Sequence, residues 1–440
     1  MSDDQLFEGD RIEVTVGEPA HGGHCVARIG GAHGQVVFVR HALPGERVTA
    51  EVTELHKGYL RADAVEVHEA SPERVTAPCA FAHPGGCGGC DLQHVAPPAQ
   101  LEWKAAVIRS LLGRMGGLSG ERIAELDVRV QPLPGGPLGW RSRVRYAVDA
   151  AGRPGLLKHR SHEVVPIDRC LIAHPELQQL DVTSRLWPDA AAVEVVASTG
   201  GDVSVRARSA DTALLPPAEP GAVEPGALLP GGNGITGALV PGDEGPAEVR
   251  ELAAGRKWQV PPEGFWQVHP AAADTLVGAV LELLQPVAGE TSWDLYGGAG
   301  LFAAALAERT RARVTVIESA PVGVAAARTN LMDLNVVEVV AGRVDVALSR
   351  RRVTGPVDLV VLDPPRTGAG TKVVRAITTA RPRAVAYVAC DPAALSRDVQ
   401  TFAAEGYQLA ALKAYDCFPM TQHIECVALF VPTYRPAAAS

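Results

Sequence analysis

A cysteine near the end of the chain stands where a reactive group is expected. Cys390 follows the apolar run at residues 386–389 and precedes Pro392, where a helical pattern begins. This pattern predicts a strand that ends at the cysteine, followed by a helix with proline in its first turn. Open α/β sheets bind ligands at the carboxyl ends of strands, and a helix amino terminus favours a thiolate. Cys390 is therefore a candidate nucleophile, although a single cysteine after a strand is more often an ordinary buried side chain.

A glycine-rich turn has the features of a nucleotide site. Residues 294–300 read Asp-Leu-Tyr-Gly-Gly-Ala-Gly, and Gly298 and Gly300 allow a ligand to approach the backbone closely. The spacing differs from the G-x-G-x-x-G of dinucleotide-binding proteins. About 20 residues further on, Glu318 ends a second predicted strand, where an acid usually binds the ribose hydroxyls. The combination resembles a class I S-adenosylmethionine (SAM) methyltransferase.

Two further carboxylates accompany Cys390. Asp363 ends the predicted strand at residues 357–362, and Glu425 lies just before a terminal strand. A thiolate, a carboxylate and a methyl donor together suit methylation of carbon 5 of uracil. Addition of the thiol at carbon 6 makes carbon 5 enolate-like, and a base then removes the carbon-5 proton so that the thiol is eliminated. After Asp363, Arg366 replaces the aromatic residue of amino-methylating enzymes, which speaks against nitrogen chemistry.

A cluster of cysteines indicates a metal or iron–sulfur site. Its candidate ligands are Cys79, Cys87, Cys90 and Cys170. Glycines between the first three allow the close turns that point several sulfurs at one centre. Four thiolates suit either zinc or an iron–sulfur cluster, with His83 and His94 as spare ligands. Three other cysteines have no such neighbours and are expected to be buried thiols: Cys25, Cys417 and Cys426.

The remaining patterns divide the chain into domains. Short alternating strands punctuated by glycine and proline predict an OB-type barrel, and residues 8–46 resemble a TRAM domain, which implies an RNA-contacting module. A barrel that only packs on its neighbour is the alternative. Residues 214–246 are rich in proline and glycine and predict loops or a linker. The expected boundaries are 5–70 for the barrel, 71–96 and 131–255 for a central cluster-binding and RNA-binding domain, 97–130 for a helix that packs on the catalytic domain, and 256–434 for the methyltransferase domain.

A basic strand in the central region is a candidate RNA contact. Arg141, Arg143 and Arg145 alternate with apolar residues, so they share one face of the predicted strand. Arginines beside aromatic residues suit an RNA backbone and stacked bases. The alternative is an ordinary solvated strand face.

Composition limits the classes of protein. The 440 residues contain 47% hydrophobic residues and carry a formal charge of −9, which suits a globular protein and argues against one that is basic all over. No secretory signal or apolar run long enough for a membrane span is evident. We therefore expect a cytoplasmic protein that does not associate with a membrane, and we expect no obligatory protein partner.

Five motifs resemble those of the RNA uracil-C5 methyltransferases, and they stand in the order of that family. They are Gly-Phe-Trp-Gln at 264–267, the glycine turn at 294–300, Asp-Pro-Pro-Arg at 363–366, Val-Ala-Cys-Asp-Pro at 388–392 and Phe-Pro-Met-Thr-Gln-His-Ile-Glu at 418–425. The resemblance implies that Cys390 is the nucleophile, that Glu425 is the base and that the four cysteines of the cluster bind [4Fe-4S]. It also implies a SAM site formed by Gln267, Tyr296, Gly298, Gly300, Glu318, Asp345 and Asp363.

The sequence therefore predicts an α/β protein with a C-terminal Rossmann-like class I methyltransferase domain, an N-terminal OB-like TRAM barrel and a small central β-rich domain with the cluster. The expected reaction is SAM-dependent methylation of carbon 5 of a uridine in structured RNA, with ribosomal RNA favoured over transfer RNA. Two alternatives remain: a methyltransferase with another target (cytosine, a nitrogen or a protein), and a non-catalytic RNA-binding relic.

Overall fold

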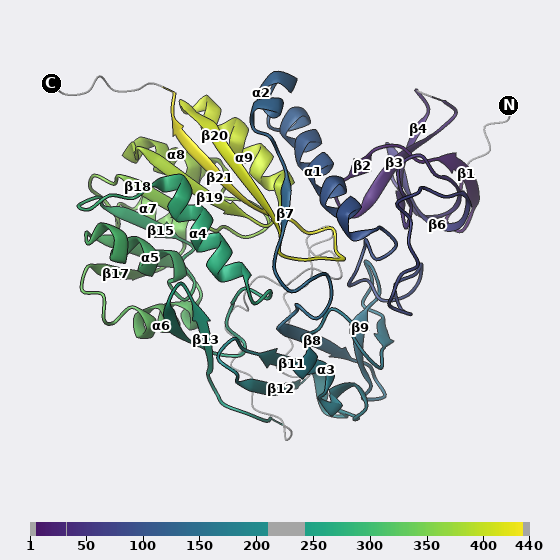
Figure 1. Cartoon of the computed structure of the whole chain (residues 1–440), viewed down its shortest axis with the longest axis horizontal. Coiled ribbons are helices and arrows are strands. Elements are labelled where there is room, and N and C mark those ends of the chain that lie inside the picture. The colour runs from purple at the N-terminus through teal and green to yellow at the C-terminus, as the bar shows by residue number, and fades with distance from the viewer. Residues whose placement is uncertain (1–5, 32, 210–242, 434–440) are drawn as a thin grey trace.

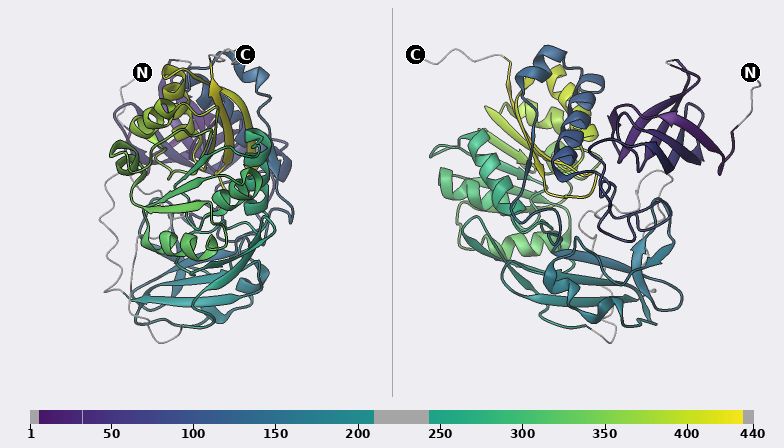
Figure 2. Two further views of the ribbon diagram at one scale, coloured as in Figure 1. Left: turned by 90° about the vertical axis from the view of Figure 1, so that its left-hand side faces the viewer. Right: turned by 45° about the vertical axis from the view of Figure 1, so that its right-hand side comes forward.

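The computed structural model describes residues 6–31, 33–209 and 243–433. Figures 1 and 2 show an N-terminal barrel and a large C-terminal α/β domain on either side of one long helix, with a central β domain beside both. Most of the loop region expected at residues 214–246 lies outside the described residues. In the described ranges, no helix is both long and apolar enough to cross a membrane.

The N-terminal domain is a six-stranded sheet with the order β1-β5-β6-β4-β3-β2. Its strands are β1 (Arg11–Thr15), β2 (Pro19–Ala20), β3 (His24–Ile29), β4 (Gln35–Arg40), β5 (Arg47–Leu55) and β6 (Tyr59–Glu69). Alternate side chains such as Val37, Val39 and Val48 are fully buried and form its core. The period-two pattern in the sequence indicates most of these strands. It does not single out β3, which contributes Cys25 and Ala27 to the same core.

The central domain is an antiparallel sheet with the order β10-β9-β8-β11-β12. Its elements are β8 (Arg143–Val148), β9 (Pro154–Leu157), β10 (Val164–Pro166), α3 (Pro175–Gln178), a 3-10 turn (Asp181–Thr183), β11 (Ala190–Ala197) and β12 (Val203–Ser209). A separate hairpin, β13 (Val249–Ala253) with β14 (Arg256–Val260), leads into the last domain.

Two helices and a short strand connect the barrel and central domain to the catalytic domain. They are α1 (Pro97–Arg114), α2 (Gly120–Glu125) and β7 (Val130–Pro132). Trp103 and Leu111 of α1 share a buried cluster with Phe402, so α1 packs on the catalytic domain. The Lys104 Nζ atom lies 2.6 Å from Asp416 Oδ1 and both side chains are buried, which joins α1 to the end of β20 (Tyr407–Asp416).

The catalytic sheet has the order β17-β16-β15-β18-β19-β21-β20-β7. Its other strands are β15 (Ser292–Leu295), β16 (Val314–Glu318), β17 (Val337–Ala341), β18 (Leu359–Leu362), β19 (Ala384–Ala389) and β21 (Glu425–Pro432). Its helices are α4 (Ala272–Leu284), α5 (Leu301–Thr310), α6 (Pro321–Asn330), α7 (Val344–Ser349), α8 (Gly370–Ala380) and α9 (Pro392–Ala404).

Side chains alternate between the two faces of this sheet. Leu359 and Val361 share a cluster with α4, α5 and α6, whereas Val360 and Leu362 share one with α7, α8 and α9. Both faces are therefore covered by helices, and β15 to β19 pair in parallel. This arrangement confirms the predicted fold class and places the carboxyl ends of the five parallel strands along one edge of the sheet.

Candidate active site

Cys390 lies between a buried strand and a capped helix. It directly follows β19, whose residues are all buried, and Asp391 is the N-cap residue of α9. The Asp391 Oδ1 atom accepts a hydrogen bond of 2.7 Å from the Ala394 amide, and Pro392 occupies the first turn. The strand and helix predicted around the cysteine are thus present, and the cap holds Cys390 at the carboxyl edge of the sheet.

Glu425 comes to the same place from the antiparallel neighbour of β19. Ala389 pairs with Cys426 in the β19–β21 ladder, so the next pair along the ladder sets Cys390 opposite Glu425. Glu425 is 3% exposed, and its Oε1 atom has no hydrogen-bond partner. Burial, followed by the Asp363 carboxylate, raises the pKa of Glu425 well above its usual value. A buried acid of raised pKa binds a proton more readily, as a general base requires.

Asp363 and Arg366 complete this group from the neighbouring strand. Asp363 directly follows β18, and burial raises its pKa. Burial raises the pKa of the Cys390 thiol as well, with further increases from Glu425 and Asp363, whereas the Arg366 guanidinium lowers it. The expectation that the helix dipole would favour the thiolate is therefore outweighed here by burial and by the two carboxylates.

A buried aspartate holds the loop that carries Arg366. The Asp398 Oδ2 atom accepts hydrogen bonds from the Ala369 amide at 2.8 Å and from the Tyr387 hydroxyl at 2.7 Å. Asp398 belongs to α9 and is 4% exposed. The helix that follows Cys390 therefore also fixes the end of the Asp-Pro-Pro-Arg loop.

The glycine turn is fixed by two acids. The Gly298 amide donates a 2.9 Å hydrogen bond to Glu318 Oε2, and the Ala303 amide donates to Asp294 Oδ2 at 2.8 Å. Gly300 has a φ of 94° and is the N-cap of α5, a conformation that favours glycine. Burial raises the pKa of Asp294 to about 7, helped by Asp363 and Glu318.

Two other predicted SAM contacts, Tyr296 and Asp345, lie at or near this turn. Tyr296 has a left-handed φ of 64°, an uncommon conformation that is often found at functional sites. Burial raises the pKa of Tyr296 to about 12, and Asp345, in the first turn of α7, is the next cause. Gln267 is buried in the segment between β14 and α4.

The acids of this edge suit a cationic cofactor. Asp294 is fully buried, and its Oδ1 atom has no hydrogen-bond partner. Asp363 and Glu318 both act on the Asp294 carboxyl, so three acids lie close together. Such a group is costly to bury unless a cation or donor reaches it. SAM carries a sulfonium, an ammonium and ribose hydroxyls, and therefore fits these residues.

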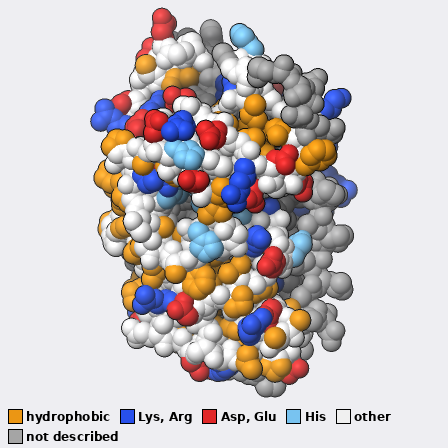
Figure 3. All heavy atoms as spheres, turned by 90° about the vertical axis from the view of Figure 1, so that its right-hand side faces the viewer, with side chains coloured by type: hydrophobic (Ala, Val, Ile, Leu, Met, Phe, Trp, Pro, Cys, Tyr) orange, Lys and Arg blue, Asp and Glu red, His pale blue; other side chains and the backbone are white. Residues whose placement is uncertain are grey.

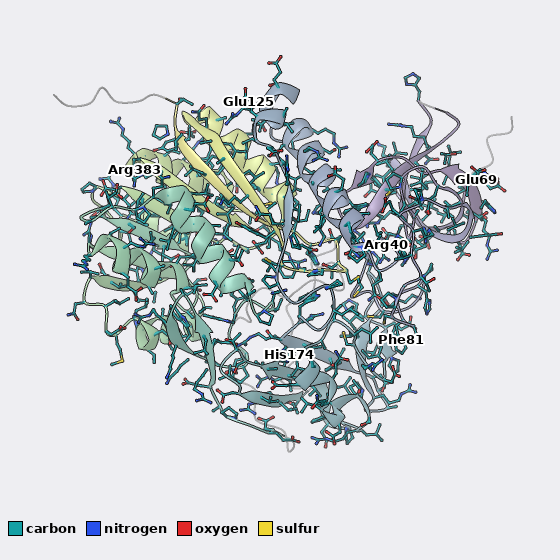
Figure 4. All side chains as sticks on the ribbon, viewed as in Figure 1. Arg40, Glu69, Phe81, Glu125, His174 and Arg383 are labelled. Carbon is teal, nitrogen blue, oxygen red and sulfur yellow. The ribbon has the colours of Figure 1, made fainter. Side chains whose placement is uncertain are left out.

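The four cysteines predicted as ligands line one small cavity of the central region. Cys79, Cys87, Cys90 and Cys170 surround it together with Phe81 and Arg141. Burial raises the pKa of Cys87 to about 11, and the Cys170 and Cys79 thiols raise it further. Figure 4 labels Phe81, which lies near β9. Within the described ranges, no three His, Cys, Asp or Glu side chains are grouped as the ligands of a single metal ion. The spare ligands His83 and His94 are not among the residues that line this cavity.

The structure corrects the prediction for the basic strand. Arg143 and Arg145 belong to β8 and alternate with the buried Val144 and Tyr146, whereas Arg141 precedes this strand. However, the Arg143 side chain is 11% exposed and lies 2.9 Å from Glu251, with two carbonyl groups as further acceptors. Arg143 is therefore committed to contacts within the protein. Arg141 lines the cysteine cavity, and Arg145 lies 3.7 Å from Glu194, so only Arg145 remains a candidate RNA contact.

Two residues of the site carry little signal in the sequence. The sequence marks Arg366 only as a replacement for an aromatic residue, yet its charge acts on both Cys390 and Glu425. Lys104 contacts Asp416 and also donates to the Phe418 carbonyl, so it fixes the start of the loop that ends at Glu425. A lysine in the apolar pattern of α1 was the only available signal for this buried contact.

The sheet order, the glycine turn and the acidic strand ends together define a class I methyltransferase fold. Comparison with known proteins identifies the family. Residues 5–65 match the TRAM domain, and residues 254–432 match tRNA (Uracil-5-)-methyltransferase. An uncharacterized RNA methyltransferase of Streptomyces avermitilis is 48% identical, covering 97% of this chain and 99% of the relative. The 23S rRNA (uracil(1939)-C(5))-methyltransferase RlmD of Shewanella denitrificans is 32% identical, covering 92% and 93%.

The chain therefore belongs to the RNA uracil-5-methyltransferase family and is an enzyme that uses SAM. The crystal structure of Pyrococcus abyssi tRNA (uracil-54, C5)-methyltransferase with S-adenosyl-L-homocysteine has the same fold. It has a TM-score of 0.67 and 23% identity, and the match covers 95% of this chain and 99% of that one. The predictions of family, TRAM domain and enzyme class are thus confirmed.

Proposed function

We propose that the protein methylates carbon 5 of a uridine in ribosomal RNA through a covalent bond between Cys390 and carbon 6 of the base. The observation that carries this proposal is that Cys390 and Glu425 lie close together at the open edge of the catalytic sheet: Ala389 pairs with Cys426, and the Glu425 carboxylate raises the pKa of the Cys390 thiol. Ribosomal RNA is favoured over transfer RNA because RlmD of Shewanella denitrificans, named for 23S rRNA, is 32% identical over nearly the whole chain. The likeness to the tRNA enzyme is at 23% identity and supports the fold alone.

Each residue has a distinct part in the proposed reaction. Cys390 gives its proton to solvent and attacks carbon 6 as the thiolate, which makes carbon 5 nucleophilic. The bound cofactor supplies the methyl group. Glu425 then removes the carbon-5 proton, and the Cys390 thiolate leaves as the ring double bond re-forms. Arg366 offsets the carboxylates beside the sulfur and so favours the thiolate.

The cysteine cavity supports the proposal of a [4Fe-4S] cluster held by Cys79, Cys87, Cys90 and Cys170. A cluster has its own atoms between the cysteine sulfurs, so the ligands surround a volume and need not meet at one ion. This favours the cluster over the alternative of zinc. Arg141 is the nearby cation, and its charge lowers the pKa of the Cys87 and Cys170 thiols, whose burial would otherwise resist ionisation.

The RNA is proposed to bind along the barrel and the central sheet. A cavity of about 340 Å³ between them is lined by Arg40, Arg61, Lys158 and Arg160, together with acidic residues and histidines. Figure 3 shows this side of the molecule, on which basic, acidic and histidine side chains are mixed. A mixed surface suits local phosphate contacts on a protein of net charge −9. We propose that the protein is cytoplasmic, because its RNA substrate is found in that compartment.

The function can be tested directly. Ribosomal and transfer RNA from cells with and without the gene are mapped for 5-methyluridine. We expect one ribosomal position to lose its methyl group in the deletion strain and to regain it when the purified protein and SAM are added. Loss from transfer RNA alone would reject the ribosomal assignment, and no loss from either would reject the proposed substrate.

A further inference from the structure

One tight turn of the barrel reaches both loops of the active site. The turn at residues 21–23 joins β2 to β3. The His21 Nε2 atom lies 3.1 Å from Asp391 Oδ2, and the Gly22 amide donates a 3.1 Å hydrogen bond to Gln422 Oε1. Asp391 directly follows Cys390, and Gln422 lies in the loop that ends at Glu425. The N-terminal barrel therefore contacts the residue next to the nucleophile and the loop that leads to the base.

The turn is built to fit closely. Gly22 and Gly23 have φ values of 90° and 75°, which favour glycine. A Cβ atom on Gly23 would lie 2.8 Å from the Cβ of Asp91, so the backbone packs directly on that side chain. Asp91 in turn accepts hydrogen bonds from the Gln422 amide at 3.1 Å and from Arg40 at 3.3 Å. Figure 4 labels Arg40, which lies near the start of α1 and the β20–β21 loop.

Asp391 places a negative charge beside a sulfur that must become negative. Its carboxylate raises the pKa of the Cys390 thiol, as do Glu425 and Asp363 after burial. One Asp391 oxygen caps α9, and the other faces His21. Although burial works to raise the pKa of Asp391, His21, the Ala394 amide and Arg397 lower it. His423, from the β20–β21 loop, lies within reach of the same pair: burial lowers its pKa, His21 lowers it further and Asp391 raises it.

We propose that His21 is a positioning residue for methyl transfer: from the barrel, it holds the Asp391 carboxylate away from Cys390 and balances its charge. Docking of the barrel turn thereby prepares the cysteine to attack the base. The barrel then has a role in the chemical step in addition to any contact with RNA. This inference rests on the covalent mechanism proposed above.

The first experiment replaces His21 in the full-length protein. Adduct formation with RNA that contains 5-fluorouridine at the target position is timed in the presence of SAM, because the fluorine blocks the final elimination. His21→Ala should slow the adduct about tenfold at saturating RNA, the factor that one unit of thiol pKa gives. The SAM affinity of this variant and the RNA concentration at which its rate is half-maximal should stay within about twofold of the wild-type values. His33 is an exposed histidine in the β3–β4 turn, so His33→Ala is the matched control and should behave as the wild type.

The second experiment asks whether His21 acts through Asp391. In an Asp391→Asn background the neutral amide can still cap α9, and there is no charge left to balance. Adding His21→Ala to this background should then slow the adduct by less than about twofold. If His21→Ala still slowed adduct formation tenfold in the Asp391→Asn background, the inference would be overturned. It would also be overturned if His21→Ala changed only the RNA concentration needed for half-maximal rate. His21→Gln, which keeps a donor without the charge, serves as a second variant, and a rate equal to the wild type would also overturn the inference.

The two proposals fail in different ways. If the wild-type protein forms no adduct at all, the covalent mechanism itself is rejected. If the wild type forms the adduct and His21→Ala forms it equally fast, only the role of His21 is rejected.

Discussion

Cys390 and Glu425 lie close together at the ends of the antiparallel strands β19 and β21. Ala389, the last residue of β19, pairs with Cys426, so the residue after Ala389 and the residue before Cys426 come to the same place, and the Glu425 carboxylate raises the pKa of the Cys390 thiol. Burial raises the pKa of both side chains, and Arg366 lowers both. A nucleophile that attacks carbon 6 and a base that removes the carbon-5 proton must reach adjacent atoms of one ring. Opposite positions on neighbouring strands satisfy this requirement.

Removal of the sulfur should abolish the reaction and spare the cofactor. Cys390→Ala is expected to show no methyl transfer from labelled SAM and no adduct with 5-fluorouridine RNA, while SAM binding measured by calorimetry stays near the wild-type value. Cys25→Ala is a matched control, because Cys25 is a buried cysteine of the barrel. Transfer at the wild-type rate by the Cys390 variant would exclude the covalent mechanism.

Replacement of the base should stop the reaction after the methyl group has moved. Glu425→Gln keeps the size of the side chain but accepts no proton, so the methylated RNA should remain attached to Cys390. Turnover should fall by about 10²–10⁴-fold. A shifted band of protein and RNA that survives denaturing electrophoresis would report the adduct. Rapid release of product would assign the proton transfer to another group.

The rate of adduct formation should rise with pH. Burial, Glu425 and Asp363 raise the pKa of Cys390 above that of an ordinary thiol, so the thiol is protonated at neutral pH, and added base increases the thiolate fraction. Arg366→Gln removes the cation that lowers this pKa. The variant should therefore be slower at neutral pH and should need a higher pH to reach half of its maximal rate. A pH profile that coincides with the wild type would show that Arg366 does not act on the thiol.

The buried pair between α1 and β20 should matter for stability. Lys104 is fully buried, and its Nζ atom lies 2.6 Å from Asp416. Lys104→Met leaves the Asp416 carboxylate buried without its partner and should cost about 3–5 kcal/mol of unfolding free energy. The double variant Lys104→Met, Asp416→Leu should recover much of this loss in urea denaturation. Equal losses in the single and double variants would show that the ion pair is not the cause.

The cysteine cavity should bind iron. The protein purified without oxygen should be coloured and contain about four iron atoms per chain, as a [4Fe-4S] cluster requires. Cys87→Ser and Cys170→Ser should lose the iron and the colour, whereas Cys25→Ser should keep both. One zinc atom and no iron would favour the zinc alternative.

The sequence alone predicted those features that depend on neighbouring residues. The glycine turn, the acids at strand ends, the proline after Cys390 and the alternation of the barrel strands are local, and their backbone preferences act wherever the chain lies. The close spacing of Cys79, Cys87 and Cys90 likewise indicated a cluster, and Cys170, the fourth ligand that the family resemblance implies, lines the same cavity.

Only the tertiary structure decided which distant groups meet. The pairing of Ala389 with Cys426 brings Glu425 close to Cys390. Packing also encloses Arg143 beside Glu251, although the alternation of Arg143 with apolar residues resembles that of an exposed strand. The contact of His21 with Asp391 depends on how the barrel docks against the catalytic domain. The periodicity of the sequence predicts on which face of its own helix or strand a side chain lies. Whether that face is buried, and which charges surround it, depends on the elements that pack against it.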